Sequence, residues 1–122
     1  MNFLNKNDVV QNLLLIRKIT SNHLPIGHSF IPYDILLAVI NSEQSGVELS
    51  VKALFTNLPY SDMGMRYHFK QLIDKGWIQL HNYPKDARIK LVKPTLKLRD
   101  SIGLLEKSFQ SIFIDSTEPP TS

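Results

Sequence analysis

Cysteine is absent from this sequence of 122 residues. Disulfide bonds, thiolate catalysis and cysteine-ligated zinc are therefore excluded. Because nothing in the composition requires an oxidising compartment, we expect a cytoplasmic location.

Long apolar runs are also missing. The most apolar stretches, residues 35–40 and 13–16, are far shorter than the roughly 20 residues that a membrane-spanning helix needs. Residues 1–6 lack the design of a signal peptide. The sequence therefore predicts no membrane partner.

Signatures of catalysis and of cofactor binding are lacking as well. No G-x-S-x-G elbow, phosphate-binding glycine loop or H-E-x-x-H motif occurs, and the acidic residues are dispersed rather than paired. The four histidines have no metal-ligand spacing; they are His23, His28, His68 and His81. We expect neither an enzyme nor a bound cofactor or metal.

What the sequence does have is an uneven charge. The formal net charge is +3, but residues 64–99 carry nine Lys and Arg against two Asp, while the flanking segments are acidic. A local cationic patch is typical of proteins that contact phosphates. A charge run alone would favour an ordinary solvated face, but its placement on a helix and a hairpin favours nucleic acid.

Periodicity predicts four helices in the first part of the chain. Residues 8–22 carry a broad apolar stripe that includes Leu13, and a second helix runs from Pro32 to a stop at Gly46. Ser50 caps a short third helix, and Ser61 caps a fourth after only a few residues of turn. This is helix-turn-helix spacing.

The fourth helix has two different faces. Met65, Phe69, Leu72 and Ile73 recur at helical spacing and are predicted to face inward until Gly76 ends the helix. The outer face is left with Met63, Arg66, Tyr67, Lys70 and Asp74.

A basic hairpin follows. Ile78 and Leu80 alternate with polar residues, as do Ile89 and Leu91, which predicts a half-buried antiparallel pair with its turn at residues 84–87. Its tip carries charged residues, namely Lys85, Asp86, Arg88 and Lys90.

The last predicted helix runs from about residue 95 to 114 and carries an apolar seam. The seam steps by four and three residues through Leu98, Ile102, Leu105, Phe109 and Ile112. Because such a stripe needs a partner helix, we expect a homodimer interface that includes these residues and Leu13. Residues 1–114 would form one domain with a DNA-binding lobe at 49–94, and residues 115–122 a disordered tail.

Residues 49–98 resemble the winged helix-turn-helix regulators of the MarR type, including the short Sar-like branch. The resemblance rests on Ser61 opening the helix, on Leu72-x-x-x-Gly76-Trp77-Ile78 closing it, and on Asp86-Ala87-Arg88 followed by an apolar strand and Thr95. It implies a mainly α-helical fold with a β-hairpin wing. It also implies a homodimeric bacterial transcription regulator whose first and last helices form the dimer interface.

The resemblance further implies a mode of binding double-stranded DNA. Arg88 would enter the minor groove, oriented by Asp86, while the fourth helix lies in the major groove. The expected DNA-binding residues are Ser61, Met63, Arg66, Tyr67, Lys70, Lys85, Asp86, Arg88 and Lys90. The sequence departs from the pattern by its shortness, by its single C-terminal helix, and by Gly64 in place of the usual Ser or Thr.

Two other readings stay open. The missing cysteine excludes thiol-based peroxide sensing but leaves a small-molecule effector, for which analogy suggests a pocket near Leu24, His28, Phe30 and Tyr33. The alternative function is a winged-helix protein-interaction module without DNA binding. The basic surface separates the two functions, because a protein-binding wing has little reason to cluster lysine and arginine.

Overall fold

The computed structural model describes residues 8–117, with side chains as far as Ile112. The described chain divides into two compact units. Unit 2 is Pro25–Arg99, and unit 1 comprises the residues up to Leu24 together with those from Asp100 onward.

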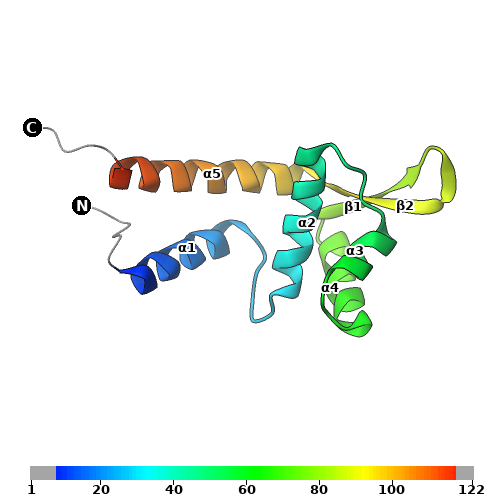
Figure 1. The fold of residues 1–122 in the computed structure, drawn as a ribbon, viewed down its shortest axis with the longest axis horizontal. Coiled ribbons are helices and arrows are strands. Elements are labelled where there is room, and N and C mark those ends of the chain that lie inside the picture. Colours follow the sequence, from blue (N-terminus) through cyan, green and yellow to red (C-terminus); the bar gives the residue numbers. More distant parts are fainter. Residues whose placement is uncertain (1–7, 118–122) are drawn as a thin grey trace, which may run out of the picture. The chain divides into compact units, whose positions relative to one another are not determined.

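Five helices and one hairpin make up the described chain (Figure 1). In chain order the elements are α1 (Val9–His23), α2 (Ile31–Ser45), α3 (Val51–Asn57), α4 (Asp62–Asp74), β1 (Ile78–Tyr83), β2 (Asp86–Pro94) and α5 (Leu96–Thr117). This order confirms the predicted winged helix-turn-helix fold class.

The helix boundaries follow from local hydrogen bonding. Ser50 Oγ accepts from the Ala53 N–H at 3.0 Å, and Ser61 Oγ accepts from the Gly64 N–H at 3.1 Å, so both predicted caps are confirmed. Gly46 ends α2 with a φ of 70°, a left-handed conformation that glycine adopts without steric cost.

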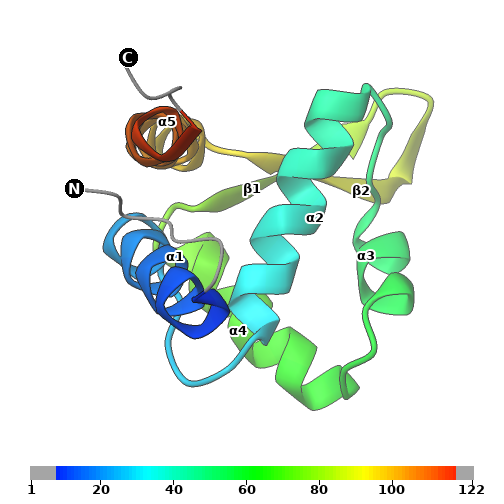
Figure 2. The ribbon, with the colours of Figure 1, turned by 60° about the vertical axis from the view of Figure 1, so that its left-hand side comes forward.

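The core of unit 2 is centred on α2, which packs against α4 and β2 while α3 packs against β2 (Figure 2). The side chains that are almost fully buried come from every element of the unit: Ile35, Leu36, Val39, Leu54, Met65, Leu72, Ile78, Leu91, Val92 and Leu98. Met65 and Leu72 confirm the predicted inner face of α4.

The predicted burial of the apolar residues along the hairpin is only partly right. Ile78 and Leu91 are buried as predicted, but Leu80 and Ile89 are exposed by 44% and 37%. Only the base of the hairpin packs on the unit, where the Val92 N–H donates to Leu49 O at 2.8 Å. The outer half extends beyond the core, so alternation there does not produce burial.

Helix α5 differs from its prediction at one residue, Leu98, which was expected in the dimer interface. Its first turn belongs to unit 2, where Thr95 Oγ1 accepts from the Leu98 N–H at 3.3 Å. Leu98 is 0% exposed, so it belongs to the core of unit 2 and has no side-chain surface left for a second chain. The helix continues to Thr117, and residues 118–122 of the predicted tail lie outside the described residues.

Unit 1 holds α1 and the remainder of α5. Asp8 caps α1, since its Oδ1 accepts from the Gln11 N–H at 2.9 Å. His23 Nε2 lies 3.3 Å from Ser108 Oγ, which connects the end of α1 to α5 within this unit. No helix within residues 8–117 has the length and apolar character that crossing a membrane requires.

Candidate nucleic-acid interface

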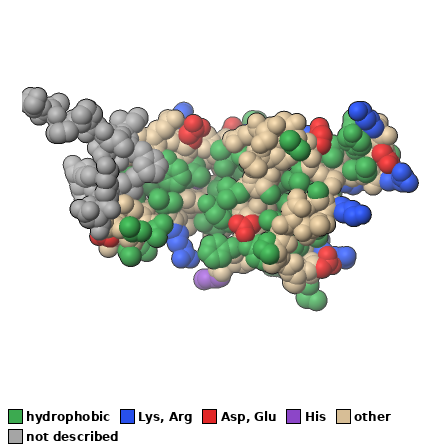
Figure 3. Space-filling model, viewed as in Figure 1, with side chains coloured by type: hydrophobic (Ala, Val, Ile, Leu, Met, Phe, Trp, Pro, Cys, Tyr) green, Lys and Arg blue, Asp and Glu red, His purple; other side chains and the backbone are tan. Residues whose placement is uncertain are grey.

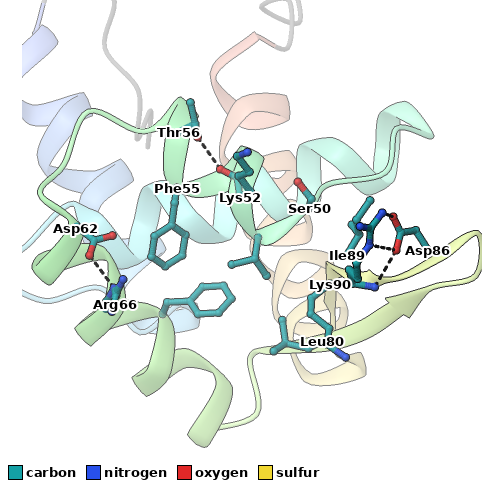
Figure 4. A pocket seen from close by; sticks show the side chains of 13 residues that line it. Ser50, Lys52, Phe55, Thr56, Asp62, Arg66, Leu80, Asp86, Ile89 and Lys90 are labelled. Atoms are coloured by element: carbon teal, nitrogen blue, oxygen red, sulfur yellow. Dashed lines mark hydrogen bonds and ion pairs between the residues drawn. The ribbon is translucent and has the colours of Figure 1, made fainter.

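A groove of about 1100 Å³ separates the helix-turn-helix from the hairpin (Figure 4). Its apolar lining includes Phe55 from α3 on one side and Leu80 and Ile89 from the hairpin on the other. Phe55 is held edge-on against Phe69 with ring centroids 5.3 Å apart. The hairpin residues that the core leaves exposed therefore form part of this groove.

Four of the predicted site residues line the groove together. Arg66 comes from α4, while Asp86, Arg88 and Lys90 come from β2. The structure thus brings together charged residues that are about 20 positions apart in the sequence.

Helix α3 and its N-cap residue add polar side chains that were not predicted as site residues. Ser50, Lys52 and Thr56 all line the groove, and Thr56 Oγ1 donates to Lys52 O at 2.8 Å. Lys52 could have been predicted as a site residue from its position, because it is an exposed cation on the first helix of a helix-turn-helix. That helix crosses the DNA backbone in proteins of this kind.

The hairpin carries an arginine, Arg88, that is hydrogen-bonded to Asp86. β1 and β2 pair with Asn82 opposite Lys90 but Tyr83 opposite Asp86, so the register shifts and residues 87–89 have no partner in this pairing. Arg88 Nε and Nη2 donate to the two carboxylate oxygens of Asp86 at 3.0 and 2.8 Å, and the Arg88 N–H donates to Asp86 Oδ1 at 3.0 Å. The Arg88 side chain is nevertheless 89% exposed. It is therefore oriented and accessible at the same time.

These contacts also fix the charge of both groups. The pKa of Asp86 is lowered, first by the side-chain hydrogen bond from Arg88 and then by that residue's backbone N–H. The same hydrogen bond raises the pKa of Arg88. Both residues are ionised at neutral pH.

The cations of α4 have acidic partners on the same helix. Arg66 Nε lies 2.7 Å from Asp62 Oδ2, and Lys70 Nζ lies 2.6 Å from Asp74 Oδ2. Exposed pairs at this spacing contribute only about 0.3–0.5 kcal/mol, so a phosphate or base can displace them.

The other predicted site residues lie outside the groove lining. Ser61 caps α4, and Met63, Tyr67 and Lys70 are exposed on its outer face. Lys85 lies in the two-residue turn between the strands. In the part of the chain that the structure describes, neither Lys52 nor Lys85 forms an ion pair.

Part of the cationic excess has a structural role. Lys93 pairs with Glu48 at 2.9 Å, and Arg99 contacts both carboxylate oxygens of Glu43. Lys97 Nζ lies 4.4 Å from the centre of the Trp77 ring. On the face drawn in Figure 3, several Lys and Arg side chains lie at the hairpin end of the molecule, with acidic groups among them.

No group of metal-ligating side chains occurs within residues 8–117. A second cavity of about 220 Å³ lies between residues 25–29 and α4, lined in part by Tyr67 and His68. Of the residues named for an effector pocket, only His28 lines this cavity, and the effector stays a prediction.

No protein-family model matches this sequence, and no curated protein matches it either. Solved structures do match. A MarR-like transcription regulator from Bacillus cereus superposes with a TM-score of 0.54 at 15% identity, covering 95% of this chain and 81% of the other. A mutant of MarR from E. coli, complexed with operator DNA, gives 0.53 at 17% identity, covering 95% and 86%.

A SlyA-like transcription regulator from Listeria monocytogenes gives a TM-score of 0.52 at 16% identity, covering 93% of this chain and 77% of the other. These matches cover α1 to α5 and are not confined to the helix-turn-helix. The chain therefore has the winged helix-turn-helix fold of MarR-type regulators.

Proposed function

We propose that this protein is a sequence-specific, double-stranded DNA-binding transcription regulator that acts as a homodimer in the cytoplasm. In this proposal α4 lies in the major groove and the hairpin reaches the minor groove.

One observation carries the proposal. Lys52, Arg66 and Lys90 come from three elements and line one groove, in a fold that also occurs in a regulator solved with operator DNA. A groove with cations on both walls is suited to a phosphate backbone, because each neutralised phosphate releases condensed counterions. Arg88, which lines the same groove, has the exposed guanidinium that a narrow minor groove attracts.

Unit 1 supports the homodimer. Helix α1 exposes Val9, Val10, Leu13 and Leu14 by 55–64%, and α5 exposes Leu104 by 52%. Large apolar side chains left in water in this number are expected where another chain covers them. The proposed surface keeps Leu13, Ile102, Leu105, Phe109 and Ile112 and omits Leu98, which the core buries.

The test is binding to a random-sequence duplex over a range of salt concentrations. We expect Lys52→Ala and Lys90→Ala each to weaken binding to all sequences and to flatten the plot of log affinity against log salt by roughly 0.9 per bound protomer. Lys107→Ala, which removes the same charge from an exposed position on α5, is the matched control and should leave the slope unchanged.

Two results would overturn the proposal. One is the absence of salt-dependent binding to any duplex, which would favour the protein-interaction alternative. The other is an equal loss of slope in the Lys107 control, which would place the contact surface outside the groove.

A further inference from the structure

The outer face of α4 exposes two large side chains that are not charged. Met63 is 82% exposed and Tyr67 is 61% exposed, and the two residues lie one helical turn apart. The Tyr67 ring also lies edge-on against His68, with centroids 5.0 Å apart. Methionine exposed to this extent leaves apolar surface in water, and a partner that covers it would gain affinity.

The charges around these two residues cancel. Along the outer side of α4, Arg66 and Lys70 are balanced by Asp62 and Asp74. Cations with no acidic partner on their own helix lie on α3 and on the hairpin instead, as Lys52 and Lys90. These four charges sum to zero, whereas Met63 and Tyr67 leave apolar surface exposed on the same face of α4.

The first turn of α4, which carries Met63, packs closely against α2. A Cβ placed on the neighbouring Gly64 would lie 3.0 Å from Ile31 Cδ1, so α4 begins in close contact with α2. Ser61 caps the same turn. The N-terminal residues of a recognition helix are those that contact base edges in helix-turn-helix proteins.

We infer that Met63, supported by Tyr67, determines sequence preference by packing against the C5 methyl group of thymine in the major groove. The inference rests on the proposed DNA binding and adds a specificity determinant to it. In that groove the thymine methyl is the apolar feature that distinguishes an A·T pair, and apolar side chains recognise it by contact. The flexible thioether of methionine suits such packing.

Replacement of thymine by uracil tests this contact, because it removes only the methyl group and leaves base pairing intact. A duplex is first selected from a randomised library with the full chain, and each thymine is then replaced singly. For the parent protein, we expect uracil at one or two positions of a half-site to weaken binding about threefold to fivefold, the effect of burying one methyl-sized group.

Met63→Ala should bind the selected duplex more weakly and lose the preference for thymine over uracil at those positions. Met63→Leu, which keeps an apolar side chain, should retain the preference. Lys90→Ala is the matched control and should lose affinity while keeping the same ratio of thymine to uracil affinity. Because Met63 is exposed, thermal melting should be the same for both Met63 variants and the parent.

Three outcomes would overturn the inference. Duplex binding with no thymine preference at any position would do so, as would an unchanged preference in Met63→Ala. Failure of the parent to bind any duplex would instead remove the proposed function, and the inference with it.

Discussion

Two acceptors compete for Arg66: the Asp62 carboxylate 2.7 Å away on α4, and a base edge if α4 enters the major groove. The exposed ion pair contributes about 0.3–0.5 kcal/mol. A bidentate contact between arginine and guanine discriminates against a wrong base by about 1–3 kcal/mol. If α4 enters the major groove, we therefore expect Arg66 to leave Asp62 and to bind the base.

We predict that Arg66→Ala weakens binding to the preferred duplex by about 1–3 kcal/mol and relaxes sequence choice, with little loss on random DNA. Fluorescence anisotropy on the two duplexes measures both effects. Asp62→Asn, which removes the negative charge that pairs with Arg66, should leave specific binding as tight or tighter. Equal losses on both duplexes for Arg66→Ala would show that Arg66 does not recognise a base.

At the scale of the element, Gly76 connects α4 to the hairpin. Its φ of 78° is left-handed, and Thr95 Oγ1 donates to its carbonyl oxygen at 2.6 Å. We predict that Gly76→Ala lowers the free energy of unfolding by about 1–2 kcal/mol, because an L side chain is strained in this conformation. Urea denaturation measures the change.

Gly27 supplies the control for that experiment. It is not among the positive-φ glycines of the described chain, and a Cβ placed on it would meet nothing within 4 Å. Gly27→Ala should therefore be neutral or stabilise by up to about 1 kcal/mol, since it reduces the entropy of the unfolded chain. Similar destabilisation at both positions would show that conformation is not the cause.

The ion pair between Glu43 and Arg99 connects α2 to the first turn of α5. The hydrogen bond from Arg99 lowers the pKa of Glu43 from its ordinary value of 4.5. A lowered pKa means that the stabilisation is complete above the unfolded value and is lost as the pH falls through the folded value. The dependence on pH therefore lies below pH 4.5.

We predict that Glu43→Gln lowers the free energy of unfolding at neutral pH by at most about 1 kcal/mol, because both side chains are partly exposed. The difference from the parent should shrink as the pH is lowered toward about 3. In an Arg99→Gln background the same change should have no effect. A difference that stays constant with pH would contradict the assignment.

The helices could be predicted from the sequence because the residues that begin and end them lie close to one another in the chain. The caps at Ser50 and Ser61 and the stop at Gly46 involve residues within a few positions of one another, so their chemistry is visible without the fold. The inner face of α4 follows from spacing alone.

The hairpin and the groove were less predictable because their causes lie far apart in the chain. Leu91 is buried where the segment around Ser50 forms a β-bridge with it. Ile89 lies beyond that segment and is therefore exposed. Lys52 lines the groove only because the fold places α3 opposite β2. Leu98 continues the apolar seam of α5 in the sequence, but its burial in unit 2 is set by tertiary packing.

At the scale of the whole molecule, the proposed homodimer has a direct test. Leu105 lies on the apolar seam of α5, so Leu105→Asp would place a charge in an interface that excludes water. We predict that this variant shifts the mass measured by light scattering at micromolar concentration from a dimer to the 14.0 kDa chain. DNA affinity should fall in parallel, since a dimer presents two recognition helices. A parent protein that is already monomeric would contradict the proposal.

In the proposed function, two copies of the chain recognise a defined DNA sequence. Selection from a randomised duplex library, followed by sequencing of the bound fraction, tests this recognition. We predict enrichment of a two-fold symmetric motif whose half-sites are centred about 10 base pairs apart, one helical turn of DNA. Enrichment of no motif in duplex that the protein binds would contradict the claim of sequence-specific recognition.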